Sequence, residues 1–181
     1  ISLSFKYKPG VHNTHKIEIE GNKMSTKYSV ENPAFFLSDS LNFQYARFDY
    51  QFIQEKRDYK EYPLEGYMRE LSIEAFHGIA NNYHNIFITA KADHHHKLHP
   101  RWSVGNSIKA KLSWKKEIPY FLNQAFGFED YLRGYEYYVI DGSQFAMTKT
   151  VLKWTLLPKT EMKLPLIQWE QFSKTHFSIF F

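Results

Sequence analysis

Apolar and polar residues alternate with a period of two along almost the whole chain, and this pattern constrains the fold more than any other feature. Between residues 67 and 76, for example, Leu71 and Ile73 alternate with Glu70, Ser72 and Glu74. Successive side chains of a β-strand point to opposite faces of a sheet, so this period predicts strands with one apolar and one polar face. The pattern predicts eight strands, at residues 2–8, 15–25, 40–53, 67–76, 85–93, 102–114, 144–157 and 172–181.

The lengths of these strands favour a membrane protein. Several exceed the roughly five to six residues of an average soluble strand, and ~9–11 residues suffice for a tilted strand to cross a bilayer. Charged pairs such as Lys109 and Lys111 fall on the polar faces, and Trp102, Trp114 and Trp154 fall near strand ends. Charged residues on one face are typical of the polar lumen of a membrane barrel, and aromatic residues near strand ends are typical of its interfacial girdles. We therefore predict an all-β fold, an antiparallel meander forming all or part of a transmembrane β-barrel, with residues 1–181 as one domain. A soluble β-sandwich also alternates and is the alternative.

The meander also predicts where side chains and connections lie. Two sets of side chains are expected on opposite faces: Glu70, Glu74, Lys109, Lys111, Lys149 and Lys153 toward the lumen, and Leu71, Ile73, Ile108, Leu112, Leu152 and Trp154 toward lipid. Successive connections alternate between the two ends of antiparallel strands. Loops at 26–39, 80–84 and 115–142 should therefore lie on one rim, and turns near Pro9, at 61–66, near Pro100 and at 159–171 on the other.

The composition limits the possible functions. The 181 residues include 23 Lys and Arg and 19 Asp and Glu, which give a net charge of +4, and the basic residues are scattered. This distribution argues against a nucleic-acid partner. The absence of cysteine excludes a disulfide framework and thiolate chemistry. No apolar run approaches the ~18 residues of a transmembrane helix.

The titratable residues do not form a recognisable active site. The carboxylates lack the spacing of an acid–base pair, and Gly142 with the serine that follows it is not part of a nucleophile elbow. His94 and His96 share one face of an extended strand, so two metal ligands are conceivable there, but Lys97 adds an adverse charge. The pattern favours a solvated strand end and turn before Pro100. We therefore predict no enzymatic activity, no cofactor and no metal site.

Two connections carry residues with specific requirements. The first is the turn Asp58-x4-Pro63-x2-Gly66, in which proline fixes φ and glycine permits the bend into the next strand. The second is an aromatic-rich loop at about residues 115–143, which contains Leu132-Arg133-Gly134-Tyr135 and ends near Gly142. The rigid fork of an arginine suits an anchor on an acidic partner. We predict that Arg133 points into a confined space, with Glu70, Glu74 and Asp93 as candidate partners.

The order of these motifs resembles the barrel domain of the BamA/TamA-type outer-membrane assembly insertases, the bacterial surface antigen family. The likeness covers roughly residues 45–181, and the tetrad at 132–135 is similar to that family's Val-Arg-Gly-Phe signature. The resemblance implies a barrel with more strands than this chain supplies, whose signature loop enters the lumen. The chain departs from the pattern at Lys149 and Lys153, where the family often has an acidic residue, so the usual partners of the arginine are missing or moved.

The resemblance also implies a function and its partners. The expected role is to fold and insert other proteins into the outer membrane of a Gram-negative bacterium. The implied partners are the lipid bilayer and lipopolysaccharide, unfolded outer-membrane clients, and accessory periplasmic or lipoprotein subunits. The chain would then be a fragment of a longer barrel. A small complete outer-membrane barrel with a structural or adhesive role is the first alternative, because terminal Phe181 resembles a sorting signal. A soluble β-barrel that binds a hydrophobic ligand is the less favoured one.

Overall fold

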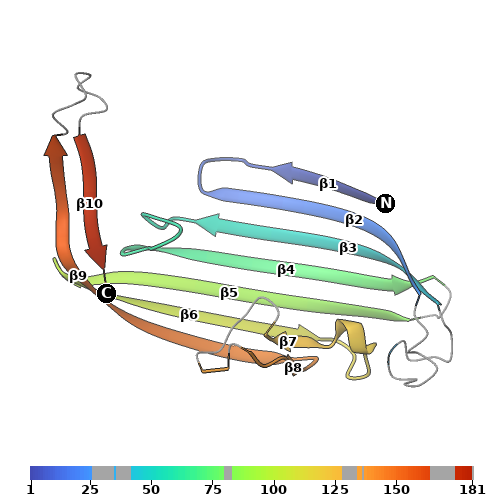
Figure 1. Ribbon diagram of the computed structural model, residues 1–181. Helices are drawn as coiled ribbons and strands as arrows, with labels where there is room; N and C mark the ends of the chain where they lie inside the picture. Colours follow the sequence, from blue (N-terminus) through green and yellow to red (C-terminus); the bar gives the residue numbers. More distant parts are fainter. Residues whose placement is uncertain are drawn as a thin grey trace. The chain divides into compact units, whose positions relative to one another are not determined.

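A computed structural model describes residues 1–25, 35, 42–79, 83–127, 134–135, 137–163 and 174–180 (Figure 1). The elements among these residues are β1 (Ser2–Tyr7), β2 (Asn13–Ser25), β3 (Asn42–Glu55), β4 (Gly66–Gly78), β5 (His84–His99), β6 (Trp102–Ser113), the 3₁₀ turn η2 (Tyr120–Leu122), β7 (Gln124–Phe126), β8 (Ile140–Asp141), β9 (Phe145–Lys163) and β10 (Lys174–Phe180). No α-helix occurs among these residues. The predicted all-β fold is confirmed.

Eight strands form one antiparallel sheet in the order β1-β2-β3-β4-β5-β6-β9-β10. Each strand pairs with its predicted neighbour, so the meander is also confirmed. Within the described part of the chain β1 and β10 do not pair with each other, and the sheet is open. Closure into a barrel, and the assignment of connections to membrane rims, stay predictions. Of the connection predicted at 26–39, the structure describes only Phe35.

The observed strands differ from the predicted ones in three places. The segment 94–99, predicted as a strand end and turn, belongs to β5, because β5 and β6 are joined by only Pro100 and Arg101 and pairing continues up to that tight connection. β9 extends to Lys163, beyond the predicted end at residue 157, so the first residues of the turn predicted at 159–171 are strand instead. The loop after β6 contains η2 and a two-stranded sheet of β7 and β8, which are too short to produce a sequence period.

The chain divides into two compact units. Unit 1 comprises Ile1–Glu55, Met68–Ala92 and Ile108–Met147, and unit 2 comprises Lys56–Tyr67, Asp93–Ser107 and Thr148–Phe181. The core of unit 1 is an aromatic cluster on one face of the sheet, in which Phe43 lies 5.4 Å from Phe121 and Phe76 lies 5.6 Å from Phe87 between ring centroids. In unit 2, Trp102 and Trp154 stack at 5.7 Å with an interplanar angle of 12°. Phe121 belongs to the segment after β6, so that segment covers part of the sheet within unit 1.

The two faces of the sheet differ in polarity and in exposure. We call the side that carries Glu70, Glu74, Lys109 and Lys111 the polar face, and the opposite side the apolar face. On the apolar face, Ile108 is 57% and Leu112 is 56% exposed. On the polar face, Asn85 and Asp93 are buried, and Lys153 is 8% exposed whereas its neighbour Leu152 is 57% exposed. The predicted division of side chains between two faces is therefore present; which face meets lipid stays a prediction.

Candidate functional site

A charged groove of about 580 Å³ lies on the polar face of unit 1. Its lining comes from β3, β4, β5, β6, β7 and β9, because every second residue of a strand points to the same face. The lining residues are Arg47, Asp49, Gln51, Glu70, Ser72, Glu74, Thr89, Lys109, Lys111, Gln124, Ala125 and Phe145. Charges of both signs converge here, so the groove suits an extended chain of mixed polarity better than a small apolar ligand.

Side-chain contacts fix several of these charges. Gln51 Nε2 donates to Glu70 Oε1 at 2.6 Å, and Ser72 Oγ donates to Asp49 Oδ1 at 3.2 Å. Asp49 stands directly opposite Glu74 in the β3–β4 register, and like charges in that position repel each other. These hydrogen bonds therefore hold the carboxylates of Asp49 and Glu70 in place. Without nearby cations, the repulsion between Asp49 and Glu74 would destabilise the sheet.

The loop after β6 is attached to this groove through its backbone. Lys111 Nζ donates to Gln124 O at 3.2 Å and lies 4.6 Å from the ring centroid of Phe87. Gln144 Nε2, at the other end of the loop, donates to Ser113 O at 2.9 Å. Both arms of the loop are therefore tied to the sheet.

A small hydrogen-bonded ring holds the root of the loop. Buried Asn85 donates from Nδ2 to Ser113 Oγ at 2.8 Å, and Ser113 Oγ donates to Lys115 O at 2.6 Å. Lys115 N donates to Asn85 Oδ1 at 2.9 Å and closes the ring. Beside it, burial raises the pKa of the Tyr83 hydroxyl to about 12. The sequence does not mark Asn85 or Ser113, because alternation places them on the polar face without indicating a partner.

Three of the five signature residues of the loop are described, and Leu132 and Arg133 lie outside the described residues. Gly134 has φ +87°, a conformation that L side chains rarely adopt, and a Cβ there would meet no atom within 4 Å. The ring of Tyr135 contacts that of Tyr138 edge-on at 5.8 Å. Gly142 N donates to Asn123 O at 3.2 Å, and a Cβ on Gly142 would approach Ala125 Cβ to 3.1 Å.

The turn in unit 2 brings Asp58, Pro63 and Gly66 together. Asp58 Oδ1 accepts hydrogen bonds from the backbone amides of Tyr59, Leu64 and Glu65 at 2.9, 3.0 and 3.2 Å. Gly66 has φ +101°, and a Cβ there would collide with the carbonyl oxygen of Lys56. The aspartate therefore organises the turn, and the glycine lets the chain enter β4 beside the end of β3.

Two buried contacts dock this turn on the polar face of unit 2. Lys153 Nζ donates to Pro63 O at 2.6 Å and lies 4.4 Å from the ring centroid of Tyr62, and burial raises the pKa of the Tyr62 hydroxyl. Arg57 Nη1 lies 3.5 Å from Asp93 Oδ2, and Ser107 Oγ donates to Asp93 Oδ1. The turn, β5, β6 and β9 thus share one polar cluster.

The candidate partners of Arg133 differ in their surroundings. Asp93 already contacts Arg57 and Ser107, and it belongs to unit 2. Glu70 and Glu74 line the groove that the loop partly covers. His94 and His96 are exposed on the apolar face, and within the described residues no three His, Asp or Glu side chains gather as a metal site would need.

Comparison with models of known protein families gave no match, and no curated protein matches the chain. Among the described residues, no helix has the length and apolar character needed to span a membrane. A functional conclusion for this chain therefore depends on the two faces of its sheet and on the motifs in its connections.

Proposed function

We propose that this chain forms part of the wall of a transmembrane β-barrel in the bacterial outer membrane. The observation that carries the proposal is the exposure of the apolar face, which stays uncovered although the opposite face carries both the buried aromatic core and buried polar groups. Ile108, Leu112 and Leu152 are more than half exposed, whereas Asn85, Asp93 and Lys153 on the opposite face are buried. A soluble protein rarely exposes so extended an apolar surface, whereas a barrel wall in lipid requires one.

The distribution of charge supports the same proposal. On the apolar face of β1 to β6, the only Lys, Arg, Asp or Glu residues are Lys23 and Arg69. Lys23 lies two residues before the end of β2, and Arg69 lies three residues after the start of β4. A lysine or arginine at the bilayer midplane costs ~2–4 kcal/mol, but the cost falls near the interface, which long side chains can reach.

Neighbouring cysteine variants test this proposal directly, since the natural chain has no cysteine to interfere. The two variants are Ile108→Cys and Lys109→Cys, and each is labelled with a fluorescent maleimide in reconstituted vesicles. The two labels differ in the face of the sheet that they occupy. We expect a lipid-soluble quencher to act on the label at 108 and a water-soluble quencher to act on the label at 109. Equal quenching of the two labels by both reagents would contradict a membrane wall.

We further propose that the barrel assists the folding and insertion of other outer-membrane proteins, together with accessory periplasmic or lipoprotein subunits. The support is the resemblance of the tetrad at 132–135 and of the Asp58-x4-Pro63-x2-Gly66 turn to the insertases. The groove, with acidic and basic groups on several adjacent strands, suits the polar backbone of an unfolded client, and the process needs no nucleotide.

Substitution of Arg133 tests the insertase proposal. Arg133→Ala should lower the yield of assembled client, measured by heat-modifiability of the client on gels, more than it lowers the folding of the protein itself. Arg133→Lys should rescue poorly, because an ammonium group cannot reproduce the guanidinium fork. Arg101→Ala, at the exposed turn between β5 and β6, is the matched control. Full client assembly with Arg133→Ala would overturn the proposal and leave the barrel wall unaffected.

A further inference from the structure

On the apolar face of unit 1, the side chains of β2 lie between those of β1 and β3, and we call this strip the furrow. The floor is formed by Ile17, Ile19 and Gly21, and a Cβ on Gly21 would meet no atom within 4 Å. In the register of the sheet, Phe5 of β1 and Tyr50 of β3 stand on either side of Ile17. Leu3 and Phe48 flank Ile19 in the same way, whereas Ala46 stands beside Gly21. The floor therefore runs between larger side chains as far as Ile19 and opens at Gly21.

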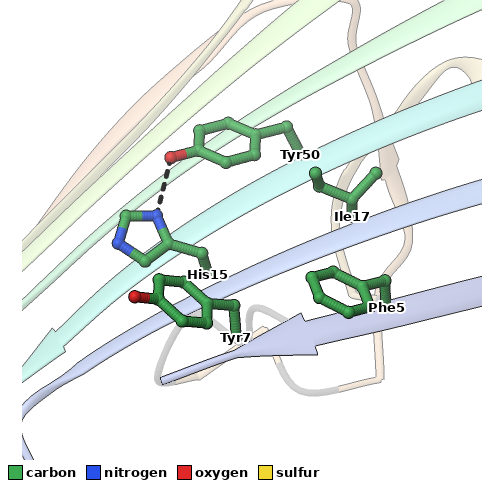
Figure 2. Close-up of a pocket in the computed structure, with 5 residues that line it drawn as sticks. All are labelled: Phe5, Tyr7, His15, Ile17 and Tyr50. Carbon is green, nitrogen blue, oxygen red and sulfur yellow. Dashed lines mark hydrogen bonds between the residues drawn. The ribbon is translucent and has the colours of Figure 1, made fainter. Parts of the chain in front are cut away.

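The furrow deepens near the start of β2 into a hollow of about 280 Å³ (Figure 2). Figure 2 shows His15, Tyr7 and the hydroxyl end of Tyr50 at one end of the hollow, with Phe5 and Ile17 at the other. His15 Nδ1 is 2.9 Å from the Tyr50 hydroxyl, and the rings of Tyr7 and His15 are 6.2 Å apart. One end of the hollow therefore carries hydrogen-bonding groups, the other end is hydrocarbon, and nearly all of the exposed lining is apolar.

The polar end lies close to the end of the strand. His15 is the third residue of β2, roughly 7 Å along the strand from its start, and Ile17, Ile19 and Gly21 follow at successive steps of roughly 7 Å. Within the described residues no protein partner is found for the second ring nitrogen of His15, Nε2. In a membrane wall, this order places hydrogen-bonding groups at headgroup level and the hydrocarbon floor below them.

We propose that this furrow binds one acyl chain of a phospholipid, with the ester and phosphate region beside Tyr7, His15 and Tyr50. This inference rests on the proposed membrane wall, because it requires lipid against the apolar face. β1 and β3 are separated by two strand spacings, roughly 9–10 Å, and their side chains narrow that space further. A hydrocarbon chain fits there, whereas a helix of ~10–12 Å diameter does not. The furrow is also continuous with the apolar face that carries exposed Ile86 and Ile88 in the same unit.

The test uses the complete protein in phospholipid vesicles that contain a phosphatidylcholine with a diazirine in one acyl chain. After illumination, mass spectrometry measures labelling of Phe5, Ile17 and Tyr50 relative to Ile88 and Leu112, which are exposed on the same face. We expect an enrichment of roughly fivefold. About six additional van der Waals contacts between the acyl chain and the furrow, at ~0.1–0.2 kcal/mol each, produce this ratio, and the acyl chain gains no hydrophobic energy because the bilayer already keeps it out of water. Ile17→Trp, which fills the furrow, should remove the enrichment, and Ile88→Trp should leave it unchanged.

The other outcomes separate this inference from the membrane wall itself. Uniform labelling of all five positions would overturn the furrow as a site and leave the wall intact. Labelling of Ile88 and Leu112 alone, with cross-links between two copies of the chain at Phe5, would show that a second copy covers the furrow and would also overturn the inference. No labelling at any of the five positions would overturn both proposals.

Discussion

The two motif-bearing connections are held in different ways. In the turn at 56–65, the residues marked by the sequence do the holding themselves: Asp58 binds three backbone amides of the turn and Gly66 admits the neighbouring strand. In the loop at 114–144, the described contacts that tie the loop to the sheet come from residues outside the signature, such as Asn85 and Ser113. A short turn can be specified by its own residues, whereas a long loop depends on the sheet beneath it.

The largest effect that would test this comparison is expected at Gly66. Gly66→Ala places a Cβ against the Lys56 carbonyl in a backbone conformation with φ +101°, so we expect a loss of ~3 kcal/mol or more in the free energy of unfolding. Urea unfolding in lipid vesicles measures it. Gly10→Ala is the control, because a Cβ at Gly10 meets no atom within 4 Å. Equal stability of the two variants would show that Gly66 is not required by its surroundings.

A second effect is expected where the turn is docked. Lys153→Met removes the hydrogen bond to Pro63 O and the contact with the Tyr62 ring, at a cost of about 1–3 kcal/mol because a buried carbonyl loses its partner. Trypsin should then cleave faster at Lys56, Arg57 or Lys60. Lys149→Met, four residues earlier on the same face of β9, should leave the cleavage rate unchanged. An unchanged cleavage rate in Lys153→Met would mean that Asp58 and Gly66 hold the turn without its contact to Lys153.

The buried tyrosine beside the loop root should give the chain an alkaline pH dependence. The pKa of Tyr83 is raised to about 12, against roughly 10 in an unfolded chain, so its contribution to stability is complete below pH ~10 and is lost as the pH rises through 12. Tyr83→Phe should therefore reduce the fall in the free energy of unfolding between those pH values by about 1–2 kcal/mol. Tyr62→Phe, in the less buried turn, should reduce it less. The reverse order would contradict the deeper burial of the loop root.

The smallest effect is expected at Gly134. Its φ of +87° disfavours a side chain, but a Cβ meets no atom within 4 Å, so Gly134→Ala should cost only ~1 kcal/mol. The same urea unfolding measures it alongside Gly66→Ala. A loss as large as that of Gly66→Ala would show that the signature loop packs as tightly at Gly134 as the turn does at Gly66.

The sequence predicted the parts of this fold that depend on local pattern. Alternation located the eight strands of the main sheet and separated Lys109 and Lys111 from Ile108 and Leu112, because a period of two follows from strand geometry alone. Residue type predicted the turn at Asp58, Pro63 and Gly66, since each of these residues restricts or frees the backbone in its own way.

The contacts that the sequence did not reveal are long-range. Lys153 and Pro63 are ninety residues apart, and nothing near Lys153 identifies a proline carbonyl as its partner. β5 continues through its histidine-rich end because it pairs with β6 up to the tight connection between them. The composition of that segment does not indicate this pairing. Asn85 likewise belongs to an ordinary alternating segment, and its role depends on the position of Ser113.

The nearest-neighbour order of the sheet has a consequence for how the chain folds. Each pairing from β1 to β6 joins segments that are adjacent in sequence, so the hairpins can add one after another at low contact order. The pairing of β9 with β6 is different, because it must first close the loop at 114–144, whereas β5 and β6 close over two residues. Loop-closure entropy alone makes that step about 2–3 kcal/mol less favourable. Addition of β9 to β6 is therefore the expected slow step in assembly of the sheet.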